Sequence, residues 1–118
     1  MSRGRTAPLA LLVDVIMVVV FATIGRRNHA EGLTATGIAA TAWPFALGAA
    51  AGWAASRGWR APTSVVATGV PVWAVSVVGG MLLRRVTGEG TAVSFVVVAT
   101  VVLAVLLLGW RAAWNRRE

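Results

Sequence analysis

The feature that most constrains the fold of this chain is a series of four long apolar segments separated by short polar connections. Each segment has on the order of 20 residues, which as a helix rising 1.5 Å per residue covers the roughly 30 Å hydrocarbon core of a bilayer. Connections this short force consecutive helices to pack antiparallel as neighbours. The sequence therefore predicts an all-α, four-helix transmembrane bundle with spans at about Ala7–Gly25, Leu33–Ser56, Ser64–Leu83 and Thr91–Trp110.

Composition supports a single integral membrane domain, residues 1–118, and excludes several other classes. Hydrophobic residues make up 58% and charged residues 13% of the chain, against roughly a quarter charged in soluble domains. The net charge of +7 comes from arginines at the ends of the apolar segments, so anionic lipid headgroups are the expected counter-charge and nucleic acid is not. The chain has no cysteine, which excludes disulfides and cysteine-ligated metals.

The distribution of arginines predicts the orientation. The side that carries both termini and the middle connection would hold Arg3, Arg5, Arg57, Arg60, Arg111, Arg116 and Arg117, and the other side Arg26, Arg27, Arg84 and Arg85. This bias predicts a multi-pass protein of the inner (cytoplasmic) membrane with both termini cytoplasmic. An interfacial belt of tryptophans is expected on the same side, formed by Trp53, Trp59, Trp110 and Trp114.

A short pattern occurs twice and indicates an internal repeat. RRNHAEG begins at Arg26 and RRVTGEG begins at Arg84, and Gly52-Trp53 corresponds to Gly109-Trp110. Residues 1–59 and 60–118 would each form one helical hairpin. Because each half contains two spans, both halves enter the membrane in the same direction, as a parallel repeat.

Asp14 is the sharpest functional candidate, because an ionised carboxylate inside a span costs roughly 2.5–3.5 kcal/mol on insertion scales. Its partner must come from another helix or subunit. One interpretation is a midplane site for a proton, an ion or a small polar ligand. The other is a carboxyl group that fixes helix packing. The other spans offer polar or indole side chains at comparable depth, namely Thr41, Trp43, Trp73, Ser76 and Thr100.

The repeated loops form a second candidate, a charge cluster at one membrane face consisting of Arg26, Arg27, His29, Glu31, Arg84, Arg85 and Glu89. The arginine fork suits carboxylate or phosphate, so the cluster could be an anion entrance. Alternatively the glutamates pair with arginines across the two halves, or the arginines reach headgroups and the glutamates cap helices. His29 has no evident co-ligands, so a loop hydrogen bond is favoured over metal binding, with pH sensing as an alternative.

The second span carries small residues at helical spacing. Gly48 and Gly52 form a GxxxG pattern that permits close approach of another helix, and Pro44 removes one helical hydrogen bond. We expect these three residues to act in helix packing.

Several segments resemble a known family. These are GRRNHAEGLTATG, TAWPFALGAAAGW, the stretch from Gly79 to Arg84, and the closing SF…GWR. They are similar to a family of small bacterial and archaeal four-span membrane proteins, domain of unknown function 3054. The resemblance covers nearly the whole chain and implies a four-helix membrane architecture. It implies no activity, cofactor or catalytic residue.

The function favoured by the sequence is transport or channel-like conduction of a small solute or ion, in a homo-oligomer that is most simply a dimer. Two alternatives stay open: a non-catalytic accessory subunit of a membrane complex, and a lipid- or pigment-binding membrane protein. No set of nucleophile, base and orienting group and no metal cluster is evident, so no enzyme activity, metal or cofactor is expected.

Overall fold

The computed structural model describes residues 3–26 and 34–117, and the described segments are helical with short connections. In chain order the elements are α1 (Arg3–Arg26), α2 (Ala35–Ser56), the 3₁₀ turn η1 (Gly58–Arg60), the π-helical turn η2 (Val65–Gly69), α3 (Val70–Val86), α4 (Val93–Leu103), the π-helical turn η3 (Ala104–Leu108) and α5 (Gly109–Arg117). The four-helix architecture expected from the apolar segments is confirmed.

The described residues form four continuous helical rods, because η2 continues into α3 and η3 joins α4 to α5. They run Thr6–Arg26, Ala35–Ser56, Val65–Val86 and Val93–Arg117, and each is long and apolar enough to cross a membrane. The last two extend further than the sequence predicts. Consequently Arg84 and Arg85 lie in the last turn of α3 instead of a loop, and Arg111 lies within a helix.

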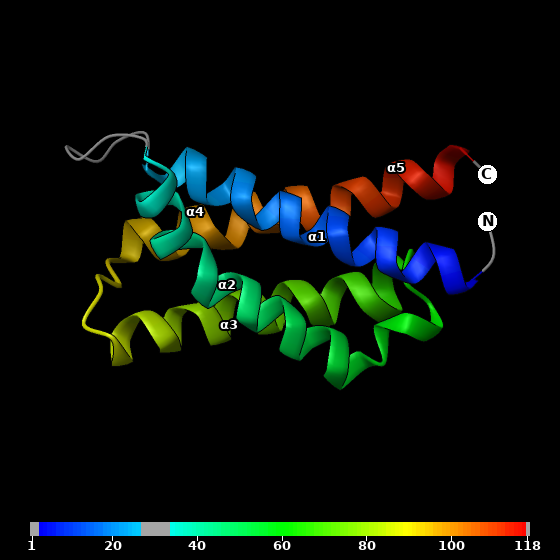
Figure 1. Ribbon diagram of the computed structural model, residues 1–118, viewed down its shortest axis with the longest axis horizontal. Coiled ribbons are helices and arrows are strands. Elements are labelled where there is room, and N and C mark those ends of the chain that lie inside the picture. The colour runs from blue at the N-terminus through cyan, green and yellow to red at the C-terminus, as the bar shows by residue number, and fades with distance from the viewer. Residues whose placement is uncertain (1–2, 27–33, 118) are drawn as a thin grey trace.

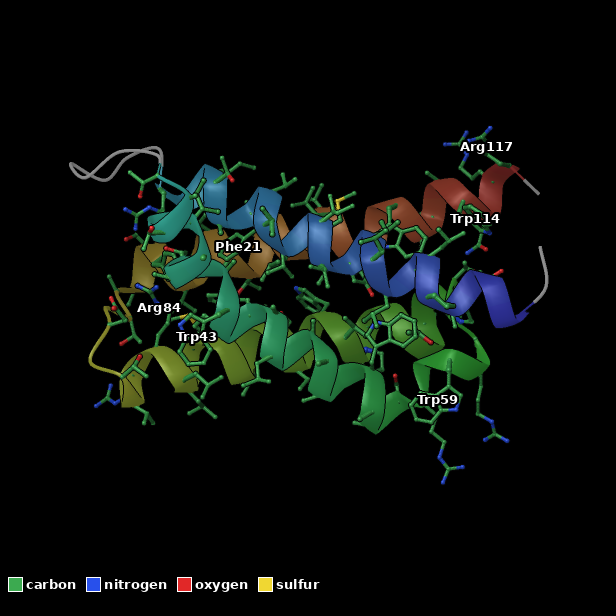
Figure 2. All side chains as sticks on the ribbon, in the orientation of Figure 1. Phe21, Trp43, Trp59, Arg84, Trp114 and Arg117 are labelled. Carbon is green, nitrogen blue, oxygen red and sulfur yellow. The ribbon has the colours of Figure 1, made fainter. Side chains whose placement is uncertain are left out.

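The bundle is elongated, and its connections alternate between its two ends. Figure 1 shows the start of α1, the end of α5 and the connection from α2 to η2 at one end, and the end of α3 and the start of α4 at the other. The longest dimension is 44 Å, close to the roughly 40–45 Å thickness of a bilayer with its headgroups. Trp59 and Arg117 project at the first end, whereas Arg84 lies near the second (Figure 2).

Burial follows the pattern expected of helices in lipid. The buried core contains Phe21, Phe45 and Leu103. Large apolar side chains are exposed along the outer surfaces of α1 and α4, among them Leu12, Ile16, Val97 and Val101. Because soluble monomers rarely expose so much contiguous apolar surface, this arrangement indicates a membrane-embedded protein.

Helices α2 and α3 pack at backbone contact. A Cβ atom built on Gly48 would lie 2.8 Å from the Cα of Ser76, and one built on Gly52 would lie 2.7 Å from the Cα of Val72. The Ser76 hydroxyl donates a 2.7 Å hydrogen bond across this contact to the carbonyl of Phe45, next to the buried Pro44. The GxxxG pattern therefore faces α3 of the same chain.

The two π-helical turns lie beside each other near the end of the bundle that carries the termini. A Cβ atom on Gly69 in η2 would meet Leu108 Cδ2 of η3 at 2.9 Å and Arg111 Cδ at 3.1 Å. The absence of a side chain at Gly69 thus makes room for the aliphatic stem of Arg111. Such π-helical turns inside α-helices are frequent at functional sites.

Candidate functional site

Asp14 and Arg111 form a buried ion pair between the middle of α1 and the start of α5. Arg111 Nη1 donates to Asp14 Oδ1 at 2.8 Å, and Nη2 donates to Oδ2 at 2.7 Å. Both side chains are 0% exposed. This paired geometry of two parallel hydrogen bonds is the strongest arrangement that a guanidinium and a carboxylate can make.

Two tryptophans complete the environment of the carboxylate. Trp53 Nε1 donates to Asp14 Oδ2 at 2.7 Å from the last turn of α2, and Trp110 Nε1 donates to Oδ1 at 2.9 Å from α5. Each carboxylate oxygen therefore accepts two hydrogen bonds. A carboxylate offers about four acceptor positions, so the described donors occupy them all. The prediction of an interfacial belt does not hold for Trp53, because its indole is buried against Asp14.

The guanidinium of Arg111 also anchors the connection between α2 and η2. Its Nε donates to the carbonyl of Pro62 at 2.9 Å, and its Nη1 makes a second bond to the carbonyl of Leu107 at 3.0 Å. The ring of Trp110 lies under the guanidinium carbon at 4.6 Å. One buried network therefore joins α1, α2, α5 and the connection between α2 and η2, which contributes the carbonyl of Pro62.

This geometry bears on the two interpretations of Asp14. The carboxylate is enclosed and its acceptor positions are occupied, so a transported ion would have to displace a guanidinium or an indole. The network also lies toward the end of the bundle with the termini, because Trp53 is in the last turn of α2 and Pro62 follows it. The arrangement favours the packing interpretation over the midplane binding site.

The other polar residues predicted near Asp14 make separate contacts. Trp73 Nε1 donates to the carbonyl of Thr100 at 2.9 Å, and the Thr100 hydroxyl donates to the carbonyl of Val96 at 2.7 Å. Ser76 bonds Phe45, as described above. The Trp73 bond links α3 to α4, the Ser76 bond links α3 to α2, and the Thr100 bond lies within α4. None of them involves Asp14.

Thr41 and Trp43 lie on different sides of α2. Trp43 is 44% exposed and belongs to the outer surface of the bundle. Thr41 is buried, and it lines a cavity at the end of the bundle opposite the termini. Neither residue is among the hydrogen-bonding partners of Asp14, so the structure does not assemble the six predicted residues into one site.

The charge cluster is a second polar centre, at this opposite end. Arg26 ends α1 and Arg84 lies in the last turn of α3, yet both side chains are only 8% exposed. They line one cavity of about 520 Å³ together with Thr41, Glu89 and small or hydroxyl residues at the start of α2, namely Thr34, Thr36, Gly37 and Ala40. Two arginines that lie far apart in sequence thus converge on one space.

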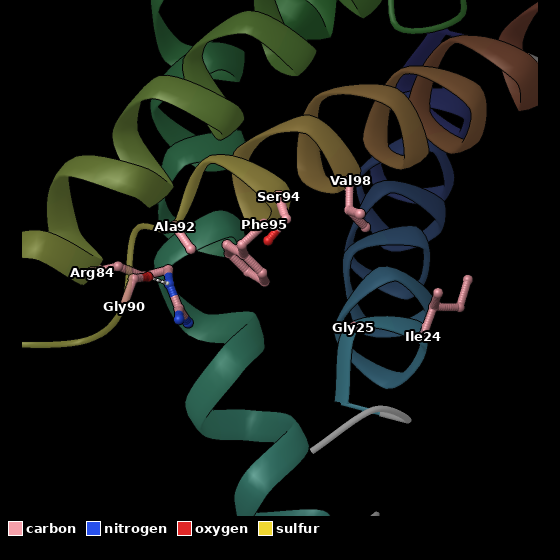
Figure 3. Close-up of a pocket in the computed structure, with 8 residues that line it drawn as sticks. All are labelled: Ile24, Gly25, Arg84, Gly90, Ala92, Ser94, Phe95 and Val98. Carbon is pink, nitrogen blue, oxygen red and sulfur yellow. Dashed lines mark hydrogen bonds between the residues drawn. The ribbon is translucent and has the colours of Figure 1, made fainter.

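Arg84 is held on two sides. Its Nε donates to the carbonyl of Gly90 at 2.9 Å, and its guanidinium carbon lies 4.2 Å from the centre of the Phe95 ring (Figure 3). Phe95 in turn packs against Phe21 and Phe45, with ring centres 6.0 Å apart in both pairs. No described residue accepts a hydrogen bond from Nη1 or Nη2 of Arg84, so these donors can serve a ligand.

The remaining members of the cluster differ in position. Glu89 is exposed at the edge of the cavity and does not cap α4, because the residue before α4 is Ala92 and makes no side-chain cap. Arg85 is exposed beside the buried Arg84. Three predicted members, Arg27, His29 and Glu31, lie outside the described residues. Among described residues, the cavity therefore brings together Arg26, Arg84 and one glutamate.

A second cavity adjoins the first through Arg84. It measures about 530 Å³, lies between the end of α1 and the start of α4, and is lined mostly by apolar or small residues (Figure 3). Besides Arg84 and Gly90 these are Ile24, Gly25, Ala92, Ser94, Phe95 and Val98. The guanidinium of Arg84 thus borders a polar space on one side and an apolar space on the other.

Sequence reasoning assigned Arg111 to the membrane surface and missed it as the partner of Asp14. A clue was present, since Gly-Trp occurs at both matched positions of the proposed repeat and GWR closes the segments that resemble the family. The two matched tryptophans converge on Asp14, one on each oxygen. An arginine directly after one of them was the natural candidate for the counter-charge.

Comparison with known proteins places the chain in a family. No curated protein and no solved structure matches the sequence. A family profile does match residues 11–114, which include Asp14, Trp53, Trp110, Arg111 and the arginine cavity. The chain therefore belongs to the family described as protein of unknown function (DUF3054).

Proposed function

We propose that this protein is a multi-pass membrane protein that takes up a small anion at the cavity lined by Arg26 and Arg84. One observation carries the proposal: two nearly buried arginines from α1 and α3 line the same polar cavity. Burying a cation in a membrane bundle is costly and marks functional positions. The described residues that line the cavity include two arginines and one glutamate, a composition that favours an anion.

The chemistry of the cavity fits a carboxylate or a phosphate. Arginine presents paired donors that match either group, and the hydroxyls of Thr36 and Thr41 add neutral donors. A volume of about 520 Å³ lies in the range of roughly 300–1,000 Å³ usual for small-molecule sites. The anion would be the transported solute, with this cavity as its entrance.

Anion binding tests this proposal. The protein purified in dodecyl maltoside would be titrated calorimetrically with inorganic phosphate and with succinate. We expect Arg84→Gln to weaken the binding of at least one anion about tenfold, because a charge-assisted hydrogen-bond pair is lost. Arg85→Gln is the matched control, since it removes the same charge from the adjacent exposed position.

Two results would contradict the proposal. Equal weakening by Arg84→Gln and Arg85→Gln would mean that anions respond only to the overall charge of this end. Failure of both anions to bind the wild-type protein would remove the proposed site. For an anion that does bind, its uptake by liposomes that contain the protein would distinguish transport from binding alone.

A second candidate function is a non-catalytic packing subunit of a larger membrane complex. The enclosed Asp14–Arg111 network favours it, because such a network stabilises one bundle arrangement and offers no space to a solute. Co-purification of a larger partner from native membranes, together with no anion binding, would favour this candidate.

Location, orientation and assembly belong to the same proposal. The arginine distribution supports an inner-membrane protein with cytoplasmic termini, although Arg111 no longer contributes because Asp14 neutralises it. The arginine cavity would then face the outside. Four helices leave little room for a path through a single bundle, so a homodimer is the simplest transporting unit. No enzymatic step is proposed.

A further inference from the structure

The polar cavity and the apolar cavity meet at a single side chain, and this juxtaposition identifies a class of ligand. We propose that they form one site for an anionic membrane lipid, with the phosphate-bearing head at Arg26 and Arg84 and an acyl chain in the apolar groove. This inference rests on the proposed function, since it uses the same arginine cavity. It specifies that the anion carries a hydrocarbon chain.

The groove is open on the outer surface of the bundle, between α1 and α4. Ile24 and Val98 border it and are each 40% exposed. Both belong to rods apolar enough to span the membrane, so their exposed faces would contact lipid. An acyl chain could therefore enter sideways from the bilayer without passing through water.

Small residues create the space in this groove. A Cβ atom added to Gly25 would meet only the ring of Phe95, at 3.8 Å, which is an ordinary van der Waals distance. Ala92 and Ser94 on the facing side are also small and exposed. Larger side chains at these positions would fill the groove, so the groove can be blocked without touching the arginines.

Arg84 is positioned to bind the phosphate head of such a lipid. Its Nε is occupied by Gly90 and its face is stacked on Phe95, which fixes the orientation of the guanidinium. No described residue accepts a hydrogen bond from Nη1 or Nη2 of Arg84, and these donors suit phosphate oxygens. The Phe95 ring, which lines the groove beneath this guanidinium, would contact the first methylenes of the chain.

Competition between lipids tests the inference. The protein in dodecyl maltoside would be incubated with equimolar phosphatidylglycerol and phosphatidylcholine of identical acyl chains, and the bound lipid would be counted by native mass spectrometry. We expect the wild-type protein to retain phosphatidylglycerol about tenfold over phosphatidylcholine, the effect of one charge-assisted pair. Arg84→Gln should abolish this preference and Arg85→Gln should keep it.

Blocking the groove separates a lipid from a free anion. Gly25→Leu should reduce retained phosphatidylglycerol severalfold but leave calorimetric binding of inorganic phosphate unchanged. Gly109→Leu is the control, because Gly109 is exposed with no atom within 4 Å of an added Cβ. Ser94→Leu fills the same groove from α4 and serves as an independent second variant should Gly25→Leu fail to fold.

The outcomes distinguish this inference from the function on which it rests. If groove-filling variants retain as much phosphatidylglycerol as the wild type, the lipid inference is overturned, while phosphate binding that depends on Arg84 still supports an anion site. If neither phosphate nor phosphatidylglycerol depends on Arg84, both proposals fail. Retention of phosphatidylglycerol that depends on Arg84 and on an open groove supports the lipid.

Discussion

Arg111→Leu is expected to destabilise the folded bundle by about 3–5 kcal/mol, because it leaves the carboxylate of Asp14 buried without its counter-charge. Asp14→Leu should have an effect of similar size for the converse reason. The free energy of unfolding can be measured by titrating the protein from dodecyl maltoside into sodium dodecyl sulfate and following helicity by circular dichroism. Arg116→Leu, at an exposed position of the same helix, is the control for loss of an arginine.

The double variant Asp14→Leu/Arg111→Leu sharpens this expectation. Removing both charges eliminates the unpaired ion but leaves the indole N–H groups of Trp53 and Trp110 without an acceptor, at roughly 1–3 kcal/mol each. The double variant should therefore be about as unstable as either single variant, so the coupling energy should equal one single-variant loss, about 3–5 kcal/mol. Additive losses would mean that the two side chains act independently, contrary to the paired geometry.

The membrane-spanning helices are the part of the fold that the sequence predicts best. Segment length and hydropathy are local properties, and a helix satisfies its own backbone groups in lipid, so four runs of apolar residues sufficed to predict the architecture. The fourth helix continues past Trp110, where the predicted span ends because Arg111 has the charge typical of a membrane interface. Its burial depends on Asp14, 97 residues away, and the periodicity of a single helix does not contain that pairing.

The candidate sites could be predicted from the sequence only in part. The repeated arginine doublets predicted a cluster at one end of the bundle, and Arg26 and Arg84 do converge there. Composition could not show that Arg84 would be buried while Arg85 remained exposed, because that depends on which side of α3 faces Phe95. Likewise, depth alone grouped Thr41, Ser76 and Thr100 with Asp14. Rotation about each helix axis instead directs Ser76 and Thr100 to backbone carbonyls and Thr41 to the arginine cavity.

The contact between α2 and α3 gives the second large expected effect. Alanine normally stabilises a helix relative to glycine by roughly 0.5–1 kcal/mol. At Gly52, however, a Cβ atom would lie 2.7 Å from the Cα of Val72 and 3.0 Å from the carbonyl oxygen of Pro71, and backbone atoms cannot rotate away. We expect Gly52→Ala to destabilise the bundle by about 2–3 kcal/mol, within the range for overpacking, in the same unfolding titration.

Gly79→Ala provides the matched control, because Gly79 lies in the same helix pair but a Cβ atom there would stay 3.4 Å from the nearest atom, the Cα of Gly48. It should be neutral or slightly stabilising. The double variant Gly48→Ala/Gly52→Ala should lose less free energy of unfolding than the two single variants added together. A single separation of α2 from α3 relieves both collisions, and it lengthens the Ser76–Phe45 hydrogen bond only once. If Gly52→Ala were as stable as Gly79→Ala, these helices could not be packed at backbone contact, and the small residues of α2 would be free to meet a helix of another subunit.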